Sequence, residues 1–152
     1  MKTLLRMCML AMLSLASLPP FIQAQTSDAS SESGRYDIHD EISVQGTASA
    51  LLPKAAKGML NGAHLFVSTS SGSMDVSLGV YGLIGKDALH VQLGQEIEIT
   101  GEMRTQHGAQ VLIARIVTVG DRIYPIRNEH GIALSPQARE RARALAQTGG
   151  KL

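Results

Sequence analysis

Apolar and polar residues alternate along several short stretches beyond residue 41, which is the pattern of β-strands with one buried face. The clearest case is GQEIEITGEM, residues 94–103, where one face carries Ile97, Ile99, Gly101 and Met103 and the other carries Glu96, Glu98, Thr100 and Glu102. Any half-exposed antiparallel strand shows such alternation. We therefore interpret the acidic row as the solvent side of a strand, and the two isoleucines as core residues.

The first predicted strand is EISVQGTASAL, residues 41–51, and contains Gly46 near its middle. A glycine in mid-strand indicates a bend or a close approach of another backbone segment. The next two strands form a hairpin, because a turn of Ser and Gly at 70–73 joins the strands Ala63–Thr69 and Met74–Leu78. This part of the chain therefore predicts an antiparallel β-sheet.

Residues 79–94, after this hairpin, contain four glycines and predict a loop with at most a short helix. Val111–Val119 is apolar on both faces except at Arg115 and Thr118, as in a central strand that is covered on both sides. The short stretch RIYPI, residues 122–126, contains a proline, which confines it to the edge of a sheet.

Arg115 interrupts the most apolar strand, and a charge there must reach solvent or a partner. Regular alternation predicts that it shares a face with Val111, Ile113, Val117 and Val119, opposite Thr118. Three interpretations stay open. The stem can lie on the barrel with its head in water, the charge can pair with a glutamate of strand 94–103, or it can contact a ligand.

A helix is predicted over residues 135–148, with Ser135 as N-cap and Pro136 at the first helical position. Its apolar stripe is mostly alanine with Leu145, which is too weak to bury firmly, so we expect the helix to lie loosely on the barrel or to fray. We expect its charged face to be solvated; this face carries Arg139, Arg141 and Arg143, with Lys151 beyond the helix.

The N-terminus has the pattern of a secretory signal peptide over residues 1–24, because Lys2 and Arg6 precede an apolar run that ends at a small residue. That run has about a dozen residues, and a membrane-spanning helix needs about 20. We therefore expect no transmembrane segment after cleavage. Residues 25–37 are polar and rich in Ser, and are expected to form a flexible leader.

The chain beyond residue 24 has no cysteine, since Cys8 lies in the predicted signal peptide, so no disulfides are expected. A secreted, small, cysteine-free domain suits a bacterial periplasm. This part carries 12 basic and 13 acidic residues, for a net charge of about −1. Nucleic-acid-binding domains usually carry a clear positive excess, so nucleic acid is not an expected partner.

Four motifs in order resemble those of small secreted bacterial proteins with an OB-like (oligonucleotide/oligosaccharide-binding) fold and no established activity. They are SLG at 77–79, LGQEIEITG at 93–101, LIAR at 112–115 and IRNEHGIAL at 126–134. The resemblance implies a mainly β fold, a five- to seven-stranded OB-like barrel over residues 38–134 with a C-terminal α-helix. The chain departs from these relatives at Ser77, where they are expected to have His, and at Ile132-Ala133, where they are expected to have Pro. If a relative uses that His as a ligand, this chain cannot do the same, because it has Ser77 at the position.

Catalytic motifs are absent from the sequence beyond residue 24. It has no Gly-x-Ser-x-Gly elbow, no cysteine nucleophile and no His-Glu-x-x-His. No two histidines fall at the short spacings of local metal-ligand pairs. We predict no enzymatic activity, no cofactor and no metal site.

Ligands of OB barrels usually bind on the face of strands two and three, between the loops that join strands one to two and four to five. Those loops carry Lys54 and Lys57, and Arg104 and His107, the four predicted contacts of an anionic ligand. The preferred hypothesis is a periplasmic or secreted, non-catalytic module that binds an unknown protein or small ligand. The alternative is a periplasmic metal- or small-anion-binding protein in envelope transport or stress defence.

Overall fold

The computed structural model describes residues 34–147, with side chains described as far as Leu145. The predicted signal peptide and most of the predicted leader lie outside these residues. The elements follow in the order η1 (Ile38–Asp40), β1 (Glu41–Leu52), β2 (Ala63–Thr69), β3 (Gly72–Gly79), β4 (Glu96–Gln106), β5 (Ala109–Val119), β6 (Arg122–Pro125) and α1 (Pro136–Gln147). A mainly β fold with one C-terminal helix is thereby confirmed.

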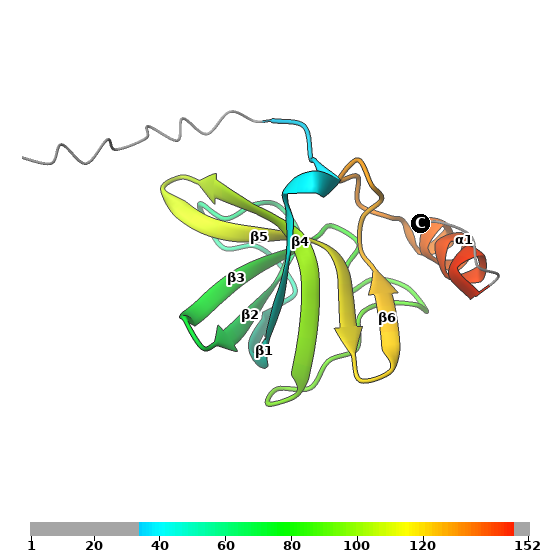
Figure 1. Cartoon of the computed structure of the whole chain (residues 1–152), viewed down its shortest axis with the longest axis horizontal. Coiled ribbons are helices and arrows are strands. Elements are labelled where there is room, and N and C mark those ends of the chain that lie inside the picture. The colour runs from blue at the N-terminus through cyan, green and yellow to red at the C-terminus, as the bar shows by residue number, and fades with distance from the viewer. Residues whose placement is uncertain (1–33, 148–152) are drawn as a thin grey trace, which may run out of the picture.

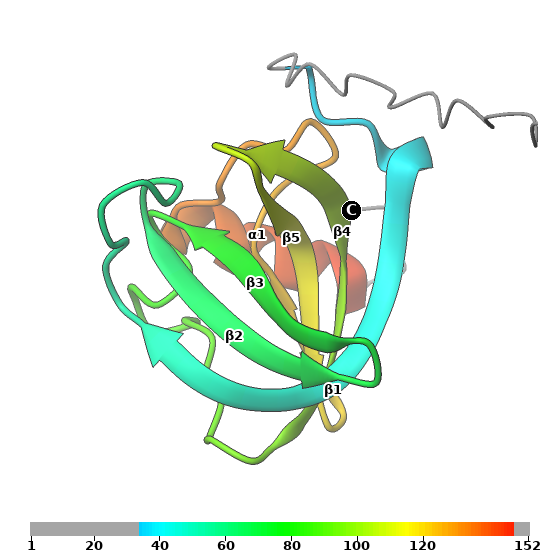
Figure 2. The same ribbon diagram turned by 90° about the vertical axis from the view of Figure 1, so that its left-hand side faces the viewer.

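Hydrogen bonds between strands close a five-stranded barrel (Figures 1 and 2). Neighbouring strands follow the order β3-β2-β1-β4-β5, and all of these pairs are antiparallel. A parallel pairing of β3 with β5, in which residues 75–77 lie opposite residues 111–113, completes the ring. β6 joins the far side of β5 as an edge strand, as its proline predicts.

The barrel interior is filled by apolar side chains from all five barrel strands. The strand GQEIEITGEM behaves as its alternation predicts, because Ile97 and Ile99 are buried and Glu96 and Glu98 are exposed. Burying one such aliphatic side chain stabilises the fold by about 1.5–3 kcal/mol. Fully enclosed members of this core include Leu65, Val67, Val76, Leu78, Ile99, Leu112 and Val117.

Two glycines let neighbouring strands approach closely. A Cβ atom at Gly46 would lie 2.5 Å from the carbonyl oxygen of Ser68, and one at Gly101 would lie 2.3 Å from that of Ile113. The close approach predicted at Gly46 is therefore confirmed. Close to this glycine β1 also shifts register against β2, between Ala48 and Ala50. Residues 41–47 of β1 pair with β4, and residues 47–52 pair with β2.

The register of β5 against β4 shifts at Arg115, because Thr100 lies opposite Ile116 while Gly101 lies opposite Ala114. Arg115 is thus the extra residue of a β-bulge, which changes the face that the following residues take. Leu112, Ala114, Val117 and Val119 belong to the barrel core, whereas Val111 and Ile113 belong to a second cluster. The prediction that Arg115 shares one face with all of Val111, Ile113, Val117 and Val119 is therefore wrong.

The second cluster lies outside the barrel and includes Tyr36, which is 8% exposed. Its side chain packs so closely on Gly131 that a Cβ atom on this glycine would lie 2.4 Å from the Tyr36 Cβ. Tyr36 belongs to the stretch predicted as a flexible leader, of which residues 34–37 are described. Within residues 34–37, the side chain of Tyr36 therefore packs against the barrel domain.

Candidate functional site

The loops predicted to bind a ligand lie together at one end of the barrel (Figures 1 and 2). Lys54 and Lys57 are exposed in the segment between β1 and β2, and His107 is exposed in the turn between β4 and β5. His107 has a φ of 49°, a left-handed conformation that a non-glycine residue rarely adopts. A ligand role for these three residues stays a prediction.

Arg104, the fourth predicted contact, already has a partner. Its Nε and a terminal nitrogen donate to the two carboxylate oxygens of Glu102, at 2.9 and 3.0 Å. Glu102 also accepts a hydrogen bond from the backbone N–H of Asp37, and its side chain is 13% exposed. Glu102 therefore differs from the other glutamates of the acidic row, because it ties η1 to β4.

Arg115 forms an ion pair with Glu41, at the start of β1. Its Nε and a terminal nitrogen donate to the two carboxylate oxygens, the latter at 2.7 Å, and the Tyr36 hydroxyl donates to Glu41 Oε1 at 2.6 Å. The side chains of Arg115 and Glu41 are 17% and 9% exposed. The ion-pair interpretation is correct in kind, but the glutamate comes from β1 and not from strand 94–103.

This three-residue network has clear electrostatic consequences. The hydrogen bonds from the Arg115 guanidinium hold the pKa of Glu41 below its usual value, against the effect of burial. Burial of the phenol, together with its hydrogen bond to Glu41, raises the pKa of Tyr36. The network is therefore a charged carboxylate held between a cation and a neutral phenol, which fixes the chain ahead of β1 to β5.

Arg139 anchors α1 to the connector between β3 and β4. It is 1% exposed, and its guanidinium donates to the carbonyl oxygens of Tyr81, Gly82 and Ile84, the first at 2.8 Å. Burial lowers its pKa. One turn further on, Arg143 pairs with Asp87 of the same connector. The prediction that this face of the helix is solvated is therefore wrong for both arginines.

An Arg139→Met variant is expected to detach α1 while the barrel stays folded, because three carbonyls lose charged hydrogen bonds worth about 1.5–3 kcal/mol each. Amide hydrogen exchange measured by mass spectrometry should become at least about tenfold faster in α1 and in residues 80–87. Arg141→Met, at an exposed position on the same helix, is the matched control and should leave exchange unchanged. Equal exchange in wild type and Arg139→Met would show that Arg139 does not hold the helix.

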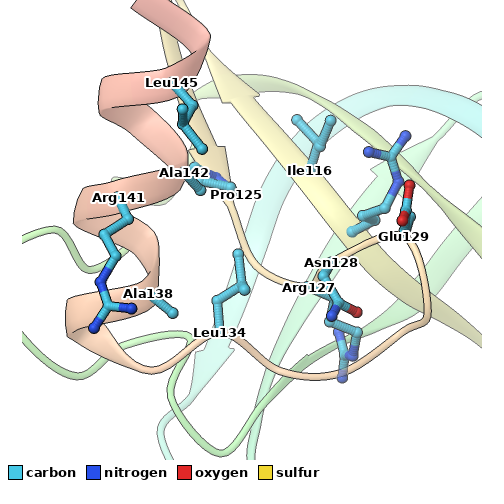
Figure 3. A pocket seen from close by; sticks show the side chains of 11 residues that line it. Ile116, Pro125, Arg127, Asn128, Glu129, Leu134, Ala138, Arg141, Ala142 and Leu145 are labelled. Carbon is cyan, nitrogen blue, oxygen red and sulfur yellow. The ribbon is translucent and has the colours of Figure 1, made fainter. Parts of the chain in front are cut away.

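The helix–barrel pocket is a cavity of about 290 Å³ between α1, β5, β6 and the loop 126–134 (Figure 3). The anchors Arg139 and Arg143 hold one side of the helix, and the other side presents small alanines that cannot fill the space to the barrel. Figure 3 shows Ala138, Ala142 and Leu145 on the helix facing side chains of the strands and the loop. The apolar lining consists of Ile116, Pro125, Leu134, Ala138, Ala142 and Leu145.

Three arginines and one carboxylate also line this pocket: Arg115, Arg127, Arg141 and Glu129. Arg127 is 8% exposed, and its guanidinium donates to the carbonyl oxygens of Ser77 and Ala114 at 2.8 and 2.6 Å. No described carboxylate forms an ion pair with it, and burial lowers its pKa to about 10. The pocket therefore has mainly apolar walls and charged residues of both signs around them.

Sequence reasoning missed this pocket, although part of the signal was present. Viewed down the helix axis, positions 138, 142 and 145 fall on one face. Positions 139 and 143 fall beside that face, so two arginines lie at the edge of the alanine stripe. Sequence alone does not indicate that the stripe faces β5 and β6, or that Arg127 turns inward. In Figure 1, α1, which forms one wall of the pocket, lies on the opposite side of the barrel from the turn between β4 and β5.

Metal-ligating residues do not gather in the described part of the chain. No group of three or more His, Cys, Asp or Glu side chains among residues 34–147 has the arrangement that holds a metal ion. The buried His64 of β2 is held internally, with Nδ1 2.7 Å from Asp75 and Nε2 2.7 Å from the Leu60 carbonyl. None of the helices described between residues 34 and 147 is both long and apolar enough to cross a membrane.

These features define a small β-barrel protein with one lateral helix and a pocket between the two. The chain belongs to the MamS/MamX magnetosome protein family, a bacterial family whose model matches residues 37–124. No curated protein and no solved structure matches the chain. The family match spans the barrel from η1 to β6, whereas most residues of the helix–barrel pocket follow it in the chain.

Proposed function

We propose that the chain is a secreted, non-catalytic binding module that serves in bacterial magnetosomes, and that its ligand or partner occupies the helix–barrel pocket. The observation that carries this proposal is the mainly apolar cavity between α1 and the barrel. Membership of a magnetosome protein family supports the place of action. The charged start and short apolar run of residues 1–24 support secretion.

We also propose that the barrel is of the OB class. The ring order β1-β2-β3-β5-β4 and the early bend of β1 support this assignment, since an OB barrel is a five-stranded Greek-key barrel. The residues SLG, LIAR and IRNEHGIAL fall in β3, in β5 and in the loop after β6, in the order that the resemblance requires. OB barrels include binders of oligonucleotides and oligosaccharides, which agrees with a binding role.

A genetic test uses a variant that fills the pocket. Ala142→Leu adds three carbon atoms to a side chain that lines the cavity and should exclude the occupant without removing any hydrogen bond. We expect this variant to fail to restore normal magnetosomes, counted by electron microscopy, in a strain that lacks the gene. Ala144→Leu is the matched control, because it makes the same change at an exposed position outside the lining and should restore them.

Both variants must be shown to fold, by circular dichroism and thermal unfolding of the purified proteins. If a folded Ala142→Leu protein restores magnetosomes as well as wild type does, the pocket has no role in function and the proposal is wrong. If the deletion strain itself forms normal magnetosomes, the proposed place of action is wrong.

A second candidate function is binding of a small anion at the opposite end of the barrel. It is favoured by the exposed Lys54 and Lys57 in the segment between β1 and β2, a segment that lies at the same end of the barrel as the turn between β4 and β5. A double variant Lys54→Ala/Lys57→Ala separates the two candidates. It should restore magnetosomes if the pocket is the site and should fail if the loops are the site.

A further inference from the structure

We infer that the buried His64 carries a proton on both ring nitrogens at neutral pH, and that this cation forms a pH-sensitive clasp on the segment between β1 and β2. The clasp consists of the bonds from the His64 ring to Asp75 and Leu60. The segment, residues 53–62, carries the exposed Lys54 and Lys57. The inference does not depend on the proposed function, because none of the clasp residues lines the helix–barrel pocket.

Both ring nitrogens of His64 lie against oxygen atoms that accept hydrogen bonds. Nδ1 lies 2.7 Å from a carboxylate oxygen of Asp75, and Nε2 lies 2.7 Å from the carbonyl oxygen of Leu60. A neutral imidazole has one N–H and one bare nitrogen, so either tautomer would place a nitrogen lone pair against an oxygen lone pair. The imidazolium donates at both positions, and both distances are typical of charged N–H···O bonds.

The reverse orientation of the ring does not remove this conflict. Turning the ring by half a rotation would exchange its nitrogens for carbons. The carbons would then lie 2.7 Å from the two oxygens, whereas C–H···O contacts are about 3.3–3.6 Å long. The residue is 0% exposed, so bulk water does not reach a bare ring nitrogen. The orientation of the ring and its two protons are therefore determined together.

The charges around the ring favour the cation. Asp75 of β3 has no other cation as ion-pair partner among the described residues. The residues directly opposite His64 are Leu52 on β1 and Ser77 on β3, and neither is charged. Arg127 reaches Ser77 from the loop after β6, but its other hydrogen bonds go to backbone carbonyls and not to Asp75. The carboxylate is therefore available to offset the imidazolium charge.

Leu60 connects the ring to the position of the segment. Its carbonyl accepts from Nε2, and its side chain packs against the outer cluster that includes Tyr36 and Ile113. The Tyr36 hydroxyl donates to Glu41, so this phenol offers no charge to the clasp. When the ring loses a proton, the Asp75 carboxylate retains the Nδ1–H, and the bare Nε2 then repels the Leu60 carbonyl. Raising the pH should therefore release the segment and its two lysines.

Nitrogen NMR of the purified protein tests the protonation of the ring. Two-bond ¹H–¹⁵N correlation spectra distinguish an imidazolium, with two protonated nitrogens, from a neutral ring, with one protonated and one bare nitrogen. At about pH 7.5 an ordinary histidine is mostly neutral, since its pKa is about 6.5. We expect the His64 signals, assigned by through-bond correlation to the backbone, to show two protonated nitrogens at this pH. One bare nitrogen would overturn the inference.

Methyl NMR tests whether the segment follows the ring. Methyl hydrogens do not exchange with water, so contacts of the Leu60 methyls with those of Val111 and Ile113 can be followed into the alkaline range. We expect these contacts to be lost in the same titration step in which the His64 ring loses a proton, while methyl contacts inside the barrel remain. Loss of the ring proton with unchanged Leu60 contacts would overturn the inference. A ring and a segment that stay unchanged until the whole barrel unfolds would also overturn it.

An Asp75→Asn variant separates the clasp from general alkaline loosening. The new amide offers an N–H to Nδ1, so a neutral ring accepts at Nδ1 and still donates from Nε2 to Leu60. We expect one bare nitrogen at neutral pH, and Leu60 contacts that persist at the pH where wild type loses them. Asp121→Asn, at an exposed aspartate, is the matched control and should respond to pH as wild type does. If a folded Asp75→Asn protein loses these contacts at the same pH as wild type, the inference is wrong.

Discussion

A Gly101→Ala variant is expected to lose about 3 kcal/mol of unfolding free energy, because the added methyl group has no space between β4 and β5. A Cβ at this position would lie 2.3 Å from the carbonyl oxygen of Ile113 and 3.0 Å from the Cα of Ala114. Both are backbone atoms of a central strand, so no side chain can rotate away. The strands would have to separate beside the bulge at Arg115, at the cost of ladder hydrogen bonds.

Equilibrium unfolding in urea measures this loss. Gly94→Ala is a useful comparison, because nothing lies within 4 Å of its added Cβ, but its φ of +85° is unfavourable for alanine. That backbone effect alone should cost about 1 kcal/mol. If the two variants lost equal stability, the close approach of β4 and β5 would not be the reason for the glycine at position 101.

The strands were predictable because short-range alternation and turn residues determine them. Residues 63–69 alternate less regularly than 94–103, yet the turns on both sides define their ends, and the structure places β2 at those bounds. The proline of β6 placed that strand at an edge before any contact was known. These signals are local, so they need no knowledge of which strands become neighbours.

The candidate site was not predictable to the same degree, because it depends on contacts between distant parts of the chain. The partner of Arg115 is Glu41, 74 residues earlier, and the anchor of Arg139 is a set of carbonyls more than 50 residues earlier. A buried arginine that donates to carbonyl oxygens has the same sequence pattern as a solvated one. Alternation also fails at Arg115, since a bulge changes the face without changing the composition of the strand.

The glutamates of β4 include two whose environment alternation predicts and one whose contacts it does not predict. Glu96 and Glu98 face solvent, as alternation predicts. Glu102 lies beyond the register shift and binds Arg104 and the backbone of Asp37. Its role depends on the chain ahead of β1 reaching β4, which the pattern within β4 does not indicate.

Replacing Glu41 with Gln is expected to lower the unfolding free energy by about 2 kcal/mol at pH 7, because it leaves the guanidinium of Arg115 largely buried without its countercharge. The Tyr36 hydroxyl would lose a charged acceptor at the same time. The value is below that of fully buried ion pairs, since both side chains keep some contact with water. Urea unfolding of wild type and variant measures it, and exposed Glu98→Gln is the control that should lose little.

The pH dependence provides the sharper test of this ion pair. The pKa of Glu41 is lowered in the folded protein by Arg115, so its stabilising contribution is fully present above the ordinary glutamate pKa of 4.5. That contribution is lost as the pH falls from 4.5 through the lower folded value, where the carboxylate takes up a proton. The stability difference between wild type and Glu41→Gln should therefore be constant from pH 7 to about pH 5 and shrink at more acidic pH. A difference that stays the same down to pH 3 would mean that the variant acts through packing and that the carboxylate charge contributes nothing.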